Sequence, residues 1–212
     1  MRKLNTVKRL GGKKIKVRPT LVLILIFLII LHTYGDDSES SLSTGQRLFI
    51  ENKPEEAVIW LELALSEDRG NKNIYNYLGI AYEQIGENQK AIDIYNRGLD
   101  YAGNLKSQFL TNIANNMGIL GNYDSAINYY SQAMVSGYNG DALRNRAGEY
   151  LRKQLYDEAL KDYKHYIAVE INPYQGEEIK RLINLLEHKL DQIAIQAIEN
   201  ERKRLEEEAR QR

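Results

Sequence analysis

The 212-residue chain contains no cysteine, only three prolines and three histidines, and no net charge, because 29 Lys and Arg residues balance 29 Asp and Glu residues. The absence of cysteine excludes a disulfide framework, a cysteine-ligated metal or iron–sulfur site, a catalytic thiol and a lipid-modified cysteine. The length fits one domain or a short array of repeats. Neutrality argues against nucleic acid as a partner only if the charge is evenly spread.

The charge is in fact divided between two parts of the chain. Residues 1–35 contain eight Lys and Arg residues and no acidic residue, so this segment carries a charge of +8. The remaining residues carry −8. The basic stretch is followed at residues 21–31 by eleven consecutive apolar residues. A basic stretch before such an apolar run is typical of an export signal.

Two fates of this leader remain open. The apolar run is shorter than the roughly 20 residues that a membrane-spanning helix needs. Thr33 and Gly35 suit a cleavage site after Gly35, whereas an uncleaved segment 20–34 would act as a membrane anchor. Because basic residues stay on the cytoplasmic side, both fates place the rest of the chain on the extracytoplasmic side of a membrane, in the cell envelope.

The chain after the leader contains four copies of a repeat about 34 residues long. Four small residues that mark the copies are separated by 34, 35 and 33 residues: Ala57, Ala91, Ala126 and Ala159. Twelve residues before each lies a second small residue: Gly45, Gly79, Ala114 and Ala147. Nine residues before each of the four alanines lies a large apolar or aromatic residue: Leu48, Tyr82, Met117 and Tyr150. Four residues after each alanine lies another: Leu61, Tyr95, Tyr130 and Tyr163.

This pattern resembles the tetratricopeptide repeat (TPR). The second copy matches best, with Tyr75, Leu78-Gly79, Tyr82, Ala91, Tyr95 and Gly98. Arg146 and Tyr166 depart from the pattern in the fourth copy, and the proline near the end of each family repeat is absent. The resemblance covers residues 38–173, as repeats 38–71, 72–105, 107–139 and 140–173. It implies an all-α fold: a right-handed α-solenoid of about four helix pairs.

Elementary packing explains the same pattern without the family. Each copy contains two stretches with apolar residues at helical spacing. Asn52, Gly86 and Gly121 lie between the two stretches, where a left-handed conformation ends a helix. Pro54 suits the first turn of the following helix. Small residues let paired helices approach to about 8–10 Å, and stacking of neighbouring copies supplies the core.

Residues 174–212 are predicted to form a long C-terminal helix and a charged helical tail. Apolar residues recur there in alternating steps of four and three: Ile179, Ile183, Leu186, Leu190, Ile193 and Ala197. One interpretation is the cap that a helical array needs at its end. A second is a coiled coil that joins copies of the chain into a homo-oligomer through residues 179–198.

The chain lacks the residue patterns of a catalytic, metal or cofactor site. His165 and His188 have no second histidine at ligand spacing. Acidic pairs such as Glu55-Glu56 lie at predicted helix starts, where they complement the helix dipole. We therefore predict that the protein is not an enzyme, needs no cofactor and does not bind nucleic acid.

The resemblance also implies a concave groove, lined by the first helix of each repeat, that binds a partner peptide. The corresponding residues in this chain are Asn73, Asn76, Tyr77, Asn112, Asn115, Arg144, Asn145 and Arg152. An asparagine amide both donates and accepts hydrogen bonds and can hold a peptide backbone. The two arginines would lie near an acidic group of the partner. The alternative is that these asparagines reflect composition, since the chain has 18 of them.

Taken together, the sequence predicts a non-enzymatic TPR interaction module or scaffold on the extracytoplasmic side of a membrane, which binds a partner peptide or protein in its groove. The alternative is a structural subunit that self-assembles through repeat stacking and the C-terminal helix. The sequence does not identify the partner or the pathway.

The repeat packing predicts that Ala91→Phe lowers the melting temperature more than Asn88→Ala. Overfilling a slot that requires a small residue costs about 1–3 kcal/mol, whereas Asn88 lies outside the repeat slots. Thermal unfolding followed by circular dichroism measures both variants. Equal effects would contradict the assignment of Ala91 to a helix–helix contact.

Overall fold

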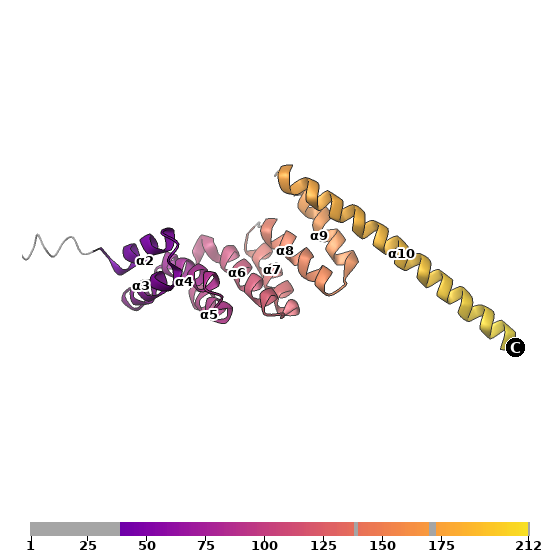
Figure 1. The fold of residues 1–212 in the computed structure, drawn as a ribbon, viewed down its shortest axis with the longest axis horizontal. Coiled ribbons are helices and arrows are strands. Elements are labelled where there is room, and N and C mark those ends of the chain that lie inside the picture. The colour runs from indigo at the N-terminus through magenta and orange to yellow at the C-terminus, as the bar shows by residue number, and fades with distance from the viewer. Residues whose placement is uncertain (1–38, 138–139, 170–172, 212) are drawn as a thin grey trace, which may run out of the picture. The chain divides into compact units, whose positions relative to one another are not determined.

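The computed structural model describes residues 39–137, 140–169 and 173–211, and the ranges contain helices and no strand. One compact unit, Ser41–Arg212, holds all of these helices (Figure 1). The helices follow in pairs, first α2 (Ser41–Ile50) with α3 (Pro54–Glu67), then α4 (Lys72–Gln84) with α5 (Asn88–Gly98). The next pairs are α6 (Lys106–Ile119) with α7 (Tyr123–Ser136) and α8 (Gly140–Arg152) with α9 (Tyr156–Val169), and α10 (Pro173–Gln211) closes the series.

Each helix packs mainly against the next one in the chain, and α6 also contacts α8. A short 3₁₀ helix, Gly103–Leu105, precedes α6. The predicted fold class is confirmed: a right-handed α-solenoid of four helix pairs followed by a long C-terminal helix. Helix α6 begins at Lys106, one residue before the predicted start of the third repeat.

The turn inside each pair contains one residue in the left-handed conformation. The expected residues have positive φ angles: 58° at Asn52, 76° at Gly86 and 81° at Gly121. In the fourth pair the residue is Gln154, with φ 59°. Sequence reasoning missed it because glutamine rarely adopts this conformation. Pro54 begins α3, as its fixed φ angle predicts.

Small residues allow the two helices of a pair to touch, and Gly79 shows how closely. A Cβ atom at Gly79 would lie 2.4 Å from Cζ of Tyr95, well inside van der Waals contact. The Tyr95 ring is fully buried and fills the space that the missing side chain leaves. Ala91, on the same helix as Tyr95, is also fully buried. The repeat pattern therefore corresponds to direct steric contacts.

The first part of α10 covers the end of the array. Ile179 and Leu186 are buried in a cluster with Leu143 and Tyr166 of the fourth pair. All described residues of α10 beyond Leu190 are exposed. The beginning of α10 therefore packs against the fourth helix pair, and the described residues beyond Leu190 make no packed contact within the unit.

The predicted leader, residues 1–35, lies outside the described residues. None of the helices in the described ranges is both long and apolar enough to span a bilayer.

An ion pair replaces an apolar contact in the fourth repeat. Arg146, which departs from the family pattern, donates from Nε to Asp162 Oδ2 at 2.7 Å and from Nη2 to Asp162 Oδ1 at 2.8 Å. Its Nη1 donates to Ser131 Oγ of α7, also at 2.8 Å. The equivalent residues of the second repeat are Leu78 and Ile94, which are both buried. Arg146 thus links α8 to α9 through the ion pair and to α7 through its hydrogen bond to Ser131.

We expect Arg146→Leu alone to destabilise the protein by about 3 kcal/mol, because it leaves the buried carboxylate of Asp162 without its counter-ion. The double variant Arg146→Leu/Asp162→Ile recreates the apolar pair of the second repeat and should recover most of that loss. Urea denaturation compares the midpoints. A double variant as unstable as the single one would contradict this explanation.

Candidate functional site

Two neighbouring cavities lie where the first helices α6 and α8 meet. The larger has a volume of about 490 Å³ and reaches from Asn115 and Gly118 of α6 to Ile179 and Leu182 of α10. The smaller has a volume of about 460 Å³ and includes Asn112. Both are lined by Asn115, Arg144 and Asn145. The two cavities adjoin at these residues, and together we call them the amide groove.

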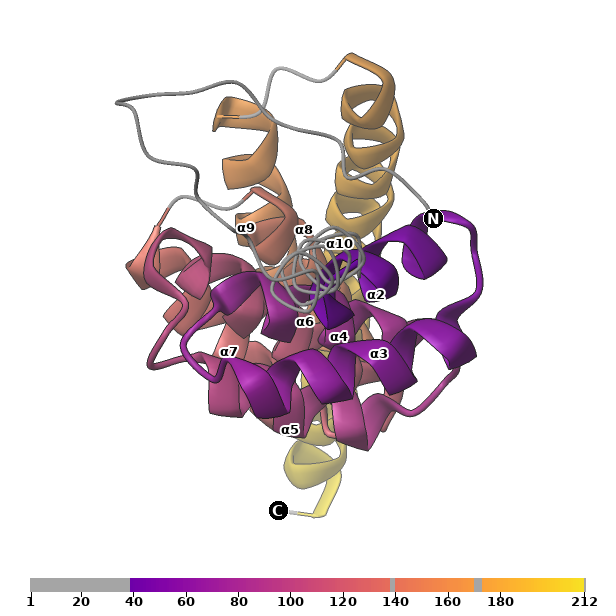
Figure 2. The same ribbon diagram turned by 90° about the vertical axis from the view of Figure 1, so that its left-hand side faces the viewer.

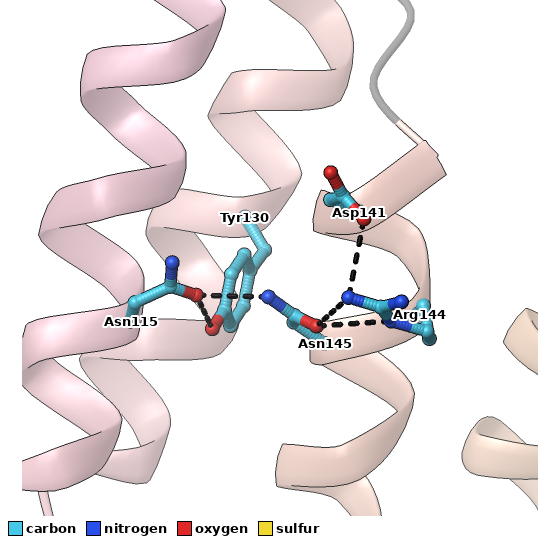
Figure 3. A network of polar contacts seen from close by, with 5 residues as sticks. All are labelled: Asn115, Tyr130, Asp141, Arg144 and Asn145. Atoms are coloured by element: carbon cyan, nitrogen blue, oxygen red, sulfur yellow. Dashed lines mark hydrogen bonds and ion pairs between the residues drawn. The ribbon is translucent and has the colours of Figure 1, made fainter.

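A hydrogen-bond network fixes the shared side chains (Figure 3). Asn145 Nδ2 donates to Asn115 Oδ1 at 2.9 Å, and the Tyr130 hydroxyl donates to the same oxygen at 2.6 Å. Arg144 donates from Nε and Nη2 to Asn145 Oδ1, at 3.3 Å each. Figure 3 shows the Asn115 amide nitrogen pointing away from these partners, so it remains oriented as a donor.

The local sequence explains why these amides share one face. Asn112 and Asn115 are three residues apart on α6, which places them one above the other along the helix. Arg144 and Asn145 occupy the corresponding turn of α8, which contacts α6 directly. The groove therefore follows from the side-by-side packing of successive first helices.

Counter-ions already neutralise both arginines that were predicted to attract an acidic group. Arg144 Nη2 lies 3.1 Å from Asp141 Oδ1. Arg152 Nε lies 3.3 Å from Glu149 Oε2, and its guanidinium lies 6.0 Å from the centroid of the Tyr123 ring. The amide groove therefore offers oriented hydrogen-bonding groups and little uncompensated positive charge.

The structure divides the predicted binding residues into two groups. Five line the amide groove: Asn112, Asn115, Arg144, Asn145 and Arg152. The other three, on α4, line neither cavity. Asn73 is exposed near the start of the helix, Asn76 Oδ1 accepts from Gln108 Nε2 at 3.4 Å, and the Tyr77 ring packs edge-on against Phe49.

Glu149 is a groove residue that sequence reasoning missed. It is buried on α8, and its Oε2 atom accepts no hydrogen bond, although this oxygen is ion-paired with Arg152. Burial raises the pKa of this carboxyl, and the nearby Arg152 partly opposes the rise. Gly118 leaves room for it, since a Cβ atom there would lie 2.6 Å from Glu149 Oε1. A glycine inside a helix was the available signal for such a close approach.

Two core tyrosines and the beginning of α10 complete the groove. Tyr130 and Tyr163 occupy repeat core positions, yet both line the larger cavity. Both tyrosines are buried, and the Tyr130 hydroxyl reaches Asn115 in the groove, which is the usual arrangement for a buried tyrosine. Glu178 of α10 also lines this cavity. No periodicity in the sequence predicts that α10 forms a wall of the groove.

Within the described ranges, no cluster of three or more His, Cys, Asp or Glu side chains is arranged to hold a metal ion. The groups that line the amide groove include amides, a tyrosine hydroxyl and ion-paired side chains, beside apolar residues such as Ile119 and Leu182. This chemistry suits reversible binding through hydrogen bonds.

Comparisons with known proteins agree with the repeat architecture. Residues 120–175 match the family model described as tetratricopeptide repeat. A search of curated proteins by sequence found no match. The structure is similar to one titled "Crystal structure of MamA", with a TM-score of 0.58 and 23% identity over 74% of this chain and 88% of that chain.

Two further solved structures share the fold. "Crystal structure of MamA protein" has a TM-score of 0.59 and 16% identity, and covers 71% of this chain and 86% of that chain. "MamA RS-1 ArsTM double mutant" has a TM-score of 0.61 and 14% identity, and the match covers 70% of this chain and 82% of that chain. At these identities the likeness concerns the fold alone. Residues 120–175 thus carry a tetratricopeptide repeat match, within a helical array of the fold that these structures share.

Proposed function

We propose that this protein is a non-enzymatic TPR scaffold that holds a partner peptide or protein in the amide groove. The observation that carries the proposal is the network of Asn115, Asn145 and Arg144, which lies where the two cavities join. Hydrogen bonds orient these polar groups in advance, so a partner loses little affinity to their ordering.

The groove chemistry favours a peptide held mainly through its backbone. Amides such as Asn112 and Asn115 pair with peptide N–H and C=O groups without selecting a side chain. Because Arg144 and Arg152 already have counter-ions, an acidic side chain of the partner is not the main determinant. Ile119 and Leu182 add apolar surface to the lining of the larger cavity.

We also propose that the repeat unit works on the extracytoplasmic side of a membrane. The +8 segment 1–35 with its apolar run supports this location, since basic residues flanking an apolar segment stay in the cytoplasm. Segment 20–34 anchors the protein if it is retained, and otherwise cleavage after Gly35 releases an acidic chain.

The groove proposal predicts the outcome of site-specific crosslinking in cells. A photo-reactive residue that replaces Ile119, which is exposed and lines the larger cavity, should capture the partner, and one at Val135 should not. Adding Asn112→Ala and Asn145→Ala should reduce capture at Ile119 about tenfold or more, because two backbone-binding amides and the network are lost. Asn128→Ala, an exposed asparagine on α7, is the matched control.

The structural alternative rests on a different observation. Ile193, Ile195 and Ile198 are exposed on the part of α10 beyond the cap. A second copy of α10 would cover them in a coiled coil. Unchanged crosslinking in the double alanine variant, with self-association lost on truncation after Leu190, would overturn the groove proposal in favour of this assembly.

The location proposal predicts that the protein is found with the cell envelope. Alkaline extraction should leave the protein in the membrane fraction if the leader is an anchor, and N-terminal sequencing should begin at Asp36 if it is cleaved. A chain with its original N-terminus that salt or alkali releases from membranes would contradict both forms of the proposal.

A further inference from the structure

The outer face of α3 exposes three large apolar side chains. Ile59, Trp60 and Leu63 are 67%, 40% and 46% exposed. Their spacing of one and three residues places them on one side of the helix. We call these three residues the α3 face. Contiguous exposed apolar groups rimmed by polar residues mark interaction sites.

The later repeats show that two of these residues are not required for repeat packing. At the position of Ile59 the later copies have Asp93, Asn128 and Lys161, and at the position of Leu63 they have Arg97, Gln132 and His165. All six are exposed polar residues. The array therefore tolerates polar groups at both positions, and only the first repeat carries isoleucine and leucine there.

In the later repeats, the position equivalent to Trp60 lies next to the preceding repeat. Two of its three equivalents, Ile94 and Asp162, are only 6% and 5% exposed, and the third, Tyr129, is partly buried. In the fourth repeat Asp162 and Ser131 of the preceding helix α7 bind the same arginine, Arg146. No described helix precedes α2 and α3, and Figure 2 shows α3 at the front of this end of the array. The geometry at Trp60 is therefore suited to a helix packed alongside.

The charge around the α3 face determines which class of partner can bind there. Helix α3 contains Glu55, Glu56, Glu62 and Glu67 and no Lys or Arg. Lys53, just before the helix, pairs with Glu51 at 2.8 Å. Two α3 faces in contact would oppose like charges, and anionic lipids would be repelled. The exposed part of α10 carries mixed charge and lacks an excess of basic residues.

We propose that the α3 face binds an amphipathic helix of a partner protein, with apolar residues on one side and lysine or arginine residues along its flanks. The apolar residues of this helix cover Ile59, Trp60 and Leu63, and its basic residues pair with Glu55 and Glu56. This site is separate from the amide groove, whose residues come from α6, α7, α8, α9 and α10.

Trp60 is the only tryptophan in the sequence, so its fluorescence reports on this face directly. The probe is a tryptophan-free synthetic amphipathic helix with a leucine stripe flanked by lysines, and a peptide with glutamates in place of the lysines is its control. Titration of the full chain with the lysine peptide should shift Trp60 emission to shorter wavelength and reach saturation, and the glutamate peptide should cause no shift.

Variants of the face separate its apolar and charged contributions. Ile59→Ser/Leu63→Ser should abolish the shift without lowering the melting temperature, whereas Val135→Ser, at an exposed apolar residue on α7, should leave it intact. Glu55→Gln/Glu56→Gln should weaken binding about three- to tenfold, which corresponds to two surface ion pairs. Asn145→Ala should not affect this titration, so that failure here is distinguishable from failure of the groove proposal.

Four results would overturn the proposal. Emission of the free protein that is already typical of a buried indole would mean that the face is covered. A shift that depends on protein concentration alone would identify a second copy as the occupant. A shift with phosphatidylcholine vesicles and none with the lysine peptide would identify a lipid surface. Equal binding of the lysine and glutamate peptides would show that the acidic residues around the α3 face do not select a basic partner.

Discussion

The fold depends on the close contact between a glycine of one helix and the aromatic ring of a tyrosine on the next. Gly79 of α4 lies so close to Tyr95 of α5 that even a methyl group would overlap the ring. This contact sets the distance between the helices of a pair and leaves the exposed side of α4 free to join a row of first helices. The first helices α6 and α8 continue this row, and their side chains supply much of the amide groove. A change in the spacing of one pair would displace every later helix, because each packs mainly on the next.

Buried polar side chains lie at the junctions between repeats. Each one either has a hydrogen-bond partner or packs against a glycine that leaves room for it. Asn116 of α6 is buried and donates to Glu83 of α4 at 2.6 Å. Burial raises the pKa of Glu83, and this hydrogen bond opposes the rise. At the next junction Glu149 lies over Gly118. Such contacts stabilise only one register of neighbouring repeats, since a shifted register would leave a buried carboxyl or amide without its partner.

The two proposed surfaces use different physical properties of the same array. The amide groove is concave and presents hydrogen-bonding groups oriented by Tyr130 and Arg144. The α3 face is apolar, rimmed by acidic residues and located on the first helix pair, where no described repeat covers it. A scaffold with two independent surfaces of this kind can bring two partners together without itself changing conformation.

The sequence by itself determined the four helix pairs, the turns at Asn52 and the equivalent glycines, the core positions and the long C-terminal helix. These features follow from local sterics and helical periodicity, which are visible along the chain. The row of asparagines was also predictable, because helical spacing places Asn112 and Asn115 on one face. Only the tertiary structure decided that Arg146 pairs with Asp162, that Asn145 binds Asn115 thirty residues away, and that α10 forms a wall of the groove. These contacts depend on how neighbouring helices are placed against one another, and the spacing of residues along a single helix does not specify that placement.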